Sequence, residues 1–194
     1  MSTNAGSSSP SAVTPSASGA QPRHGLSKLA RVSSPSTCQC SRAWGNTYVS
    51  VSARGSQIVM SHEATHVATG AAVSSMPTWL LEGFADYVAL DHVDLPVSVT
   101  ASQILARVRK SGPPAHLPGK TEFDPENQAL GASYESAWLA CRLLAERYGE
   151  KRLIAFYRAS DRDDSTTAAF RDLLGTDQQA FTRAWKGYLR KLAG

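Results

Sequence analysis

The chain has 194 residues, of which 42% are hydrophobic, so it is long enough to form one domain with a real apolar core. Its net charge is only +4, and the basic residues are scattered except for a small group formed by Arg183, Lys186, Arg190 and Lys191. Because such a group complements the C-terminal end of a helix, we expect no nucleic-acid partner. No long apolar run is present, so we expect no transmembrane helix.

We predict a disordered tail at residues 1–44 and a single domain at residues 45–194. Ser, Pro, Ala, Thr and Gly dominate residues 1–37, and this composition has too few large apolar groups to offset the entropy lost on ordering. As written, the N-terminus encodes no signal peptide. Two interpretations of the localisation stay open: a protein that remains inside the cell, and an incomplete gene product without its export signal.

The three cysteines do not form a disulfide framework. Cys38 and Cys40 are separated by a single residue, which is too close for an ordinary unstrained bridge. We expect them to be two idle thiols, and a contribution to a metal site is the alternative. Cys141 falls inside a predicted helix and is expected to be part of the core.

The first predicted elements are a strand and a long helix. Large and small side chains alternate at residues 48–52, which predicts a strand, and a turn is expected at residues 54–55. A helix should then run from Ser56 to about Ala72, with Ser56 or Gly55 as its N-cap. The side chains expected on its apolar side are Ile58, Val59, Ala64, Val67 and Ala68.

A second helix is predicted from Thr78 to about Leu90, because Pro77 is suited to the start of a helix and a connection precedes it. Residues 94–100 should be extended or a loop, and residues 102–110 a short helix. The predicted helices of the C-terminal half are residues 132–148, 150–160, 165–174 and 177–192, the last with Asp177 as its N-cap.

Residues 111–130 are rich in Gly, Pro and polar side chains and form a long predicted loop. Loops of this length are usually functional or mobile. We therefore expect the loop to frame a substrate cleft, and a passive connector is an equally weighted alternative. The predicted fold class is α+β, mostly helical with a small N-terminal β region.

The motif that points to chemistry is HEATH at positions 62–66, the H-E-x-x-H pattern of zinc hydrolases. On a helix, positions i and i+4 lie on the same face, so His62 and His66 can reach one metal ion. Glu63 would lie beside that ion, where a bound water would sit. Glu82 on the next helix is the natural third ligand, and three protein ligands with one open position are typical of catalytic zinc.

Asp86 lies four residues after Glu82 and therefore on the same helical face. A ligating histidine usually donates its second ring N–H to a carboxylate or a carbonyl, and Asp86 is placed to accept it from His62 or His66. The alternative interpretation is a helix that carries two histidines by chance, followed by a surface glutamate. That alternative does not explain the second helix.

HEATH together with WLLEGFADY at positions 79–87 resembles the gluzincin metallopeptidases, the clan of thermolysin and the zinc aminopeptidases. The short spacing between the two motifs is more similar to the bacterial peptidase MA-like proteins. The similarity to that group extends to residues 132–138 and 144–149 and to a C-terminal pattern made of Leu174, Gly175, Phe181, Trp185 and Leu189. The resemblance therefore covers roughly residues 45–192. No G-x-M-E-N-type motif is present, and aminopeptidase activity is therefore not implied.

The resemblance implies a zincin-like fold with Zn²⁺ as the cofactor. It implies His62, His66 and Glu82 as metal ligands, Glu63 as the general base and Asp86 as the residue that supports the ligands. Zincins normally place a small sheet beside the metal-binding helix, and only one strand is predicted here. Relatives of this kind are often exported or attached to membranes.

We therefore expect a zinc-dependent endopeptidase that acts on a peptide or protein substrate. Tyr134, at the start of a helix that follows the long loop, is the candidate donor to the oxyanion, and a packing aromatic is its alternative role. His92 and His116 are weaker candidates for the same function. Two other hypotheses stay open: a non-catalytic zinc-stabilised binding domain, and a metal-free helical interaction module.

Overall fold

The computed structural model describes residues 53–162 and 166–194 of the chain. Within these ranges every regular element is a helix and no strand occurs, so the predicted α+β class is wrong and the described part of the protein is helical. The strand predicted at residues 48–52 lies outside the described residues. Cys38, Cys40 and the predicted tail lie outside them as well.

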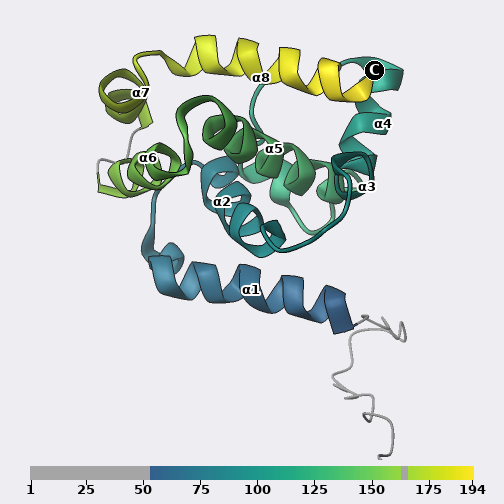
Figure 1. Cartoon of the computed structure of the whole chain (residues 1–194), viewed down its shortest axis with the longest axis horizontal. Helices are drawn as coiled ribbons and strands as arrows, with labels where there is room; N and C mark the ends of the chain where they lie inside the picture. The colour runs from purple at the N-terminus through teal and green to yellow at the C-terminus, as the bar shows by residue number, and fades with distance from the viewer. Residues whose placement is uncertain (1–52, 163–165) are drawn as a thin grey trace, which may run out of the picture. The chain divides into compact units, whose positions relative to one another are not determined.

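The elements follow one another with short connections, and Figure 1 shows their arrangement. In chain order they are α1 (Ala53–Thr69), the 3-10 helix η1 (Ala71–Val73), α2 (Thr78–Leu90), α3 (Val97–Thr100), α4 (Ser102–Ser111), the 3-10 helix η2 (Lys120–Phe123), α5 (Leu130–Tyr148), α6 (Glu150–Arg162), α7 (Thr166–Leu174) and α8 (Gln178–Ala193).

The first helix begins earlier than predicted. Residues 54–55 were expected to form a turn but belong to α1, and the predicted cap at Ser56 is wrong for the same reason. Glycine is tolerated in a first helical turn because the N–H groups there have no partner within the helix. The helix ends at Thr69, where Gly70 adopts a left-handed conformation with φ 70° and ψ 27°, which glycine reaches without strain.

Most other predicted helices are confirmed. The helix α2 has the predicted bounds and follows Pro77, and α4 to α8 differ from their predicted ends by only a few residues. The Asp177 side chain caps α8 as expected, because it accepts a hydrogen bond of 2.6 Å from the backbone N–H of Ala180. The short helix α3 occupies part of the segment predicted to be extended or a loop.

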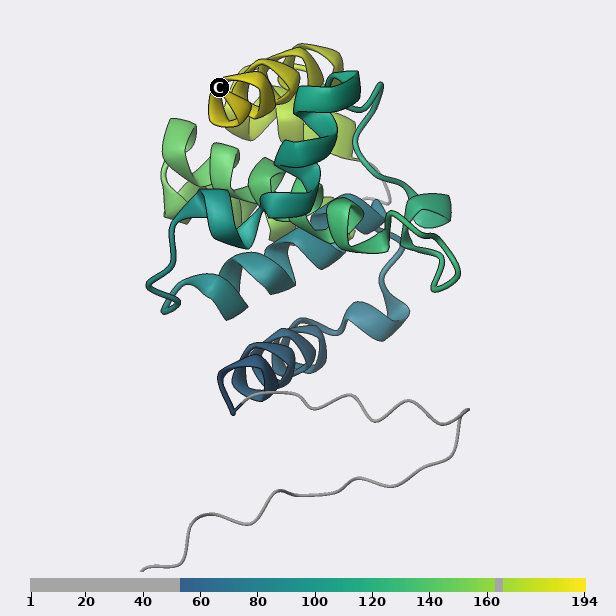
Figure 2. The ribbon, with the colours of Figure 1, turned by 90° about the vertical axis from the view of Figure 1, so that its right-hand side faces the viewer.

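The apolar core lies among α2 and the helices from α4 to α8 (Figure 2). Its largest fully buried side chains are Trp185, Phe156, Phe170, Phe181, Leu80, Ile104, Leu105, Leu139, Leu144, Leu153 and Leu189. Cys141 is fully buried, as predicted. None of the described helices is both long and apolar enough to cross a bilayer.

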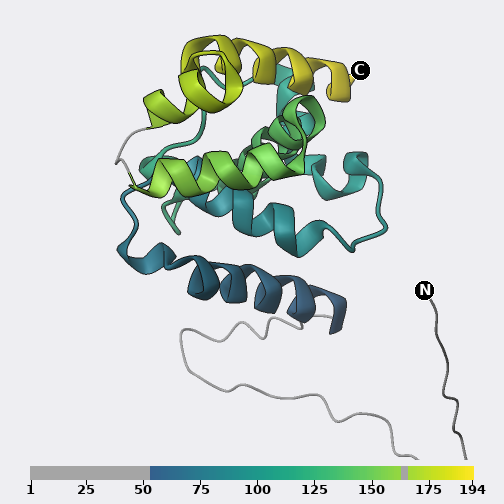
Figure 3. The same cartoon turned by 60° about the vertical axis from the view of Figure 1, so that its left-hand side comes forward.

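The helix α2 packs against α1 on one side and α5 on the other (Figures 1 and 3). A Cβ atom at Gly83 would lie 2.4 Å from the backbone carbonyl oxygen of Ala137 and 3.1 Å from the Cys141 sulfur. The backbones of α2 and α5 therefore approach each other too closely for any side chain at this position. This contact fixes α2 against the core, directly beside Glu82.

The predicted apolar side of α1 faces away from the rest of the described structure. Val59 and Val67 are 54% and 83% exposed, and Ala64 and Ala68 are exposed too. The side of α1 that faces α2 instead carries polar residues, among them the buried Thr65. The two helices therefore meet through polar side chains, and most of the side chains predicted on the apolar side of α1 are exposed.

Candidate metal centre

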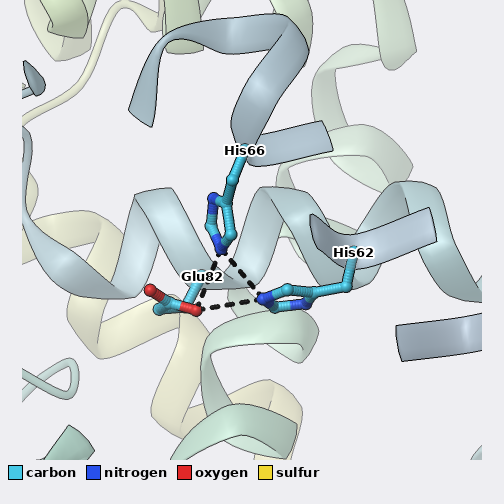
Figure 4. A group of neighbouring side chains, drawn as sticks. All are labelled: His62, His66 and Glu82. Atoms are coloured by element: carbon cyan, nitrogen blue, oxygen red, sulfur yellow. Dashed lines mark hydrogen bonds and ion pairs between the residues drawn. The ribbon is translucent and has the colours of Figure 1, made fainter. Parts of the chain in front are cut away.

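Three side chains from two neighbouring helices converge on one point (Figure 4). The Nε2 atoms of His62 and His66, both from α1, lie 2.9 Å apart. The Oε2 atom of Glu82, from α2, lies 3.2 Å from the first of these nitrogens and 3.3 Å from the second. We call these three residues the His–Glu cluster. The convergence follows from the i, i+4 spacing on α1 and from the close packing of α2.

The His–Glu cluster has the size and the chemistry of a metal site. A tetrahedral ion about 2.1 Å from each ligand atom holds those atoms roughly 3.4 Å apart, which is close to the separations found here. Two imidazole nitrogens and one carboxylate oxygen suit several divalent transition metals, zinc among them. The cluster is also accessible, because the side chains of His62, His66 and Glu82 are 12%, 18% and 16% exposed.

The two histidines differ in how their second nitrogen is held. The Nδ1 atom of His62 lies 2.7 Å from Oδ1 of Asp86, which is on the same face of α2 as Glu82. This bond orients the ring so that Nε2 points at the other members of the cluster. The Nδ1 atom of His66 is buried and has no hydrogen-bond partner among the described residues.

The electrostatics of the His–Glu cluster favour a positive charge at its centre. Burial disfavours the charged imidazole, but the hydrogen bonds to Asp86 and Glu82 outweigh it and raise the pKa of His62 to about 10. Burial likewise opposes the charge of Glu82, yet its contacts with both histidines lower the pKa of that carboxyl group. Without a metal, the cluster therefore holds a proton that an incoming cation must displace.

Glu63 and Tyr134 lie beside the cluster. Glu63 follows His62 on α1 and is exposed. Tyr134, near the start of α5, is partly buried, and its ring centroid is 6.0 Å from that of His62. Burial and the negative charges of Glu82, Asp86 and Glu63 all raise the pKa of the Tyr134 phenol. The hydroxyl therefore stays protonated at neutral pH and is available as a donor.

The long loop before α5 contacts this region through Phe123. The Phe123 ring packs edge-to-face against Tyr134, with centroids 4.9 Å apart. The loop is held in shape by its own polar groups, since the Glu122 carboxylate accepts from the Gly119 N–H at 2.8 Å and the Asn127 amide donates to the Glu122 carbonyl at 3.1 Å. The loop was predicted to frame a substrate cleft, and this stays a prediction. Through Phe123 the loop contacts Tyr134, whose ring centroid lies 6.0 Å from that of His62.

The two other histidines that the structure describes are not part of the cluster. His92 is 93% exposed and lies 3.5 Å from the Asp91 carboxylate. The exposed His116 donates from Nδ1 to the carbonyl of Leu117 at 3.1 Å. His24 lies outside the described residues.

The sequence did not predict two aromatic residues that contact neighbours of the cluster: Phe123 contacts Tyr134, and Tyr157 contacts Thr69 and Phe84. The Tyr157 hydroxyl, on α6, donates to Thr69 Oγ1 at 3.1 Å across 88 positions of the chain. Each is an aromatic residue in a segment without a motif. No local sequence pattern therefore indicated these contacts.

Comparisons with known proteins found no relative of this chain. Neither a protein-family model, nor a curated protein, nor a solved structure matches the chain. The geometry and chemistry of the His–Glu cluster and its surroundings therefore carry the inference of function.

Proposed function

We propose that this protein is a zinc-dependent metallopeptidase of the gluzincin type, most similar to the peptidase MA-like group, that hydrolyses peptide bonds within a peptide or protein. The observation that carries the proposal is the meeting of two histidine Nε2 atoms and one glutamate oxygen within 3.3 Å of one another. A glutamate follows the first histidine directly, which is the arrangement that zinc hydrolases require of a general base.

Zinc is the favoured metal because two histidines and one glutamate are the ligand set of thermolysin-like catalytic sites, with the fourth position open. When bound there, zinc lowers the pKa of a coordinated water towards 7 and polarises the carbonyl of the scissile bond. Asp86 supports this arrangement by accepting the Nδ1 proton of His62, which leaves Nε2 free to bind the metal.

Glu63 is the proposed general base and acid. Its carboxylate accepts a proton from the attacking water as the oxygen bonds to the carbonyl carbon. The same proton then passes to the nitrogen of the leaving amine as the C–N bond breaks, so Glu63 ends the cycle ionised, as it began. The exposure of Glu63 on α1 is consistent with this role, because the base must reach a substrate that enters from solvent.

Tyr134 is the proposed donor to the oxyanion that forms on the carbonyl oxygen. It lies against His62, and its raised pKa keeps the proton on its hydroxyl at neutral pH. A donor of this kind is most valuable where charge develops in the transition state. Phe123 packs against the Tyr134 ring and restricts its movement.

A second candidate function is a zinc-stabilised binding domain without catalysis. One observation favours it: among the described residues, no side chain of α1 belongs to the apolar core, and the His–Glu cluster joins this helix to α2. A metal ion bound there would crosslink α1 and α2. A non-catalytic domain does not need the Glu63 carboxylate, so a substitution of Glu63 distinguishes the two proposals.

The experiment compares the wild type with Glu63→Gln, measuring zinc stoichiometry together with digestion of a peptide library read by mass spectrometry. We expect both proteins to bind one zinc ion and only the wild type to cleave peptides. Glu150→Gln, which changes an exposed glutamate at the start of α6, is the matched control and should cleave normally. Zinc binding without cleavage by the wild type would favour the binding domain, and a wild type that binds no zinc would overturn both proposals.

A further inference from the structure

The helix that carries both histidines contacts neighbouring helices near its middle and at its C-terminal end. Near its middle, His62 and His66 contact Glu82 and Asp86 of α2. At its C-terminal end, the Thr69 hydroxyl accepts a hydrogen bond of 3.1 Å from the hydroxyl of Tyr157, on α6. This second tie lies one helical turn beyond His66.

Tyr157 touches both of the helices that supply the metal ligands. Its hydroxyl bonds to α1, and its ring stacks on Phe84 of α2 with centroids 4.2 Å apart and planes inclined by 29°. Phe84 is two positions from Glu82. The tyrosine is only 3% exposed, and its neighbour Phe156 is fully buried in the core. Tyr157 is therefore a rigid brace between α1 and α2, anchored in the apolar core.

The brace matters most for His66. His62 is oriented through its own ring, because Asp86 holds its Nδ1 atom. The Nδ1 atom of His66 has no such partner, so the position of its ring depends on where the backbone of α1 lies. The hydrogen bond from Tyr157 restrains that backbone through Thr69. The Thr69 hydroxyl accepts from Tyr157 and donates to the Thr65 carbonyl of α1 at 2.8 Å.

We propose that Tyr157 is a positioning residue of the metal site, whose hydroxyl holds the end of α1 so that His66 stays within reach of the ion bound by His62 and Glu82. This inference rests on the proposed metal-binding function. In this proposal the hydrogen bond between Tyr157 and Thr69 supports His66, as Asp86 supports His62.

The test measures zinc affinity by competition with a chelating dye, and the visible spectrum of the Co²⁺ form, which reports ligand geometry. Tyr157→Phe removes the hydroxyl and keeps the ring on Phe84, and Thr69→Val removes the acceptor. Supporting residues of metal sites typically contribute about 10- to 100-fold in affinity, and for this indirect contact we expect roughly tenfold weaker zinc binding in either variant, with an altered Co²⁺ spectrum.

Three further variants make the test specific. The double variant Tyr157→Phe with Thr69→Val should bind zinc no more weakly than Thr69→Val alone, because the bond between Tyr157 and Thr69 is already lost in that single variant. Thr69→Ser keeps the hydroxyl and should retain wild-type affinity. Tyr188→Phe is the matched control, since its hydroxyl donates to Glu146 at 2.9 Å, and it should also bind normally.

Unchanged zinc affinity and an unchanged Co²⁺ spectrum in Tyr157→Phe would overturn the inference, even if the variant melts at a lower temperature, because the residue would then be only structural. Should Tyr157→Phe fail to fold, Thr69→Val tests the same hydrogen bond, because Thr69 is only partly buried. A wild-type chain that binds no zinc would be a different result, because it overturns the proposed function itself.

Discussion

The packing of α8 on α5 and the packing of α1 on α2 rest on different interactions. Between α8 and α5, the fully buried Trp185 fills the interface, and its indole N–H donates to the Ser136 carbonyl at 3.1 Å. Between α1 and α2, the contacts include the hydrogen bonds of His62 and His66 to carboxylates. The first interface buries apolar surface, and the second gathers charge around a point that can hold a cation.

This difference implies that the two interfaces depend on different conditions. Burial of apolar surface contributes about 25 cal/mol per Å² whether or not a ligand is present. Hydrogen bonds to charged groups contribute about 1.5–3 kcal/mol each and depend on the protonation of both partners. We therefore expect the core to be stable without metal, and the attachment of α1 to depend on the occupant of the His–Glu cluster.

The largest effect should come from breaking the apolar interface. Trp185→Ala deletes a fully buried indole and leaves a cavity, which typically costs about 3–5 kcal/mol of unfolding free energy. Denaturant unfolding followed by circular dichroism measures this loss. The zinc affinity of the folded variant should match the wild type, and a parallel loss of affinity would show that the two interfaces are not independent.

Removing the metal should act on the other interface alone. At a free zinc concentration of 100 times the dissociation constant, binding stabilises the structure that holds the metal by about 2.7 kcal/mol. After chelation, hydrogen exchange should speed up in α1 and stay unchanged in α5 and α8. Equally accelerated hydrogen exchange in α1, α5 and α8 would contradict the expectation that the two interfaces depend on different conditions.

Asp86→Asn should have an intermediate effect. The amide cannot provide the negative charge that supports His62, so zinc affinity should fall by about 10- to 100-fold. Isothermal titration calorimetry gives the affinity directly. Asp161→Asn alters an exposed carboxylate on α6 and is the control, for which no change is expected.

The smallest effect is expected on the outer side of α1. Val67 is 83% exposed, so Val67→Gln should change the unfolding free energy by no more than about 0.5 kcal/mol. Thermal denaturation of the zinc-bound protein provides the measurement. A much larger loss would mean that this side of α1 is covered in solution.

The sequence predicted those features that short patterns specify. The spacing of His62 and His66 placed both rings on one face, and the structure brings Glu82 to the same point. Pro77 marked the beginning of α2, and Asp177 capped α8 as expected. In each case the controlling interaction lies within a few residues of the chain, except for Glu82, which a second recognisable motif identified.

The features that were predicted wrongly, or not at all, depend on tertiary contacts. The apolar side of α1 was predicted from the sequence without its partner, and Val67 on it is 83% exposed, because α1 contacts α2 through His62 and His66 instead. The α+β class failed because the described residues contain no strand. The contact between Tyr157 and Thr69 joins segments far apart in the chain, and no periodicity or motif marks it.

The most direct test of the central claim is zinc stoichiometry and affinity in the wild type, Glu82→Ala and His92→Ala, with metal content checked by mass spectrometry. We predict one tightly bound zinc ion per wild-type chain, a severe loss of binding in Glu82→Ala, and unchanged binding in His92→Ala, whose imidazole is 93% exposed and outside the His–Glu cluster. Wild-type affinity in Glu82→Ala, or a wild type that takes up no zinc, would contradict the account.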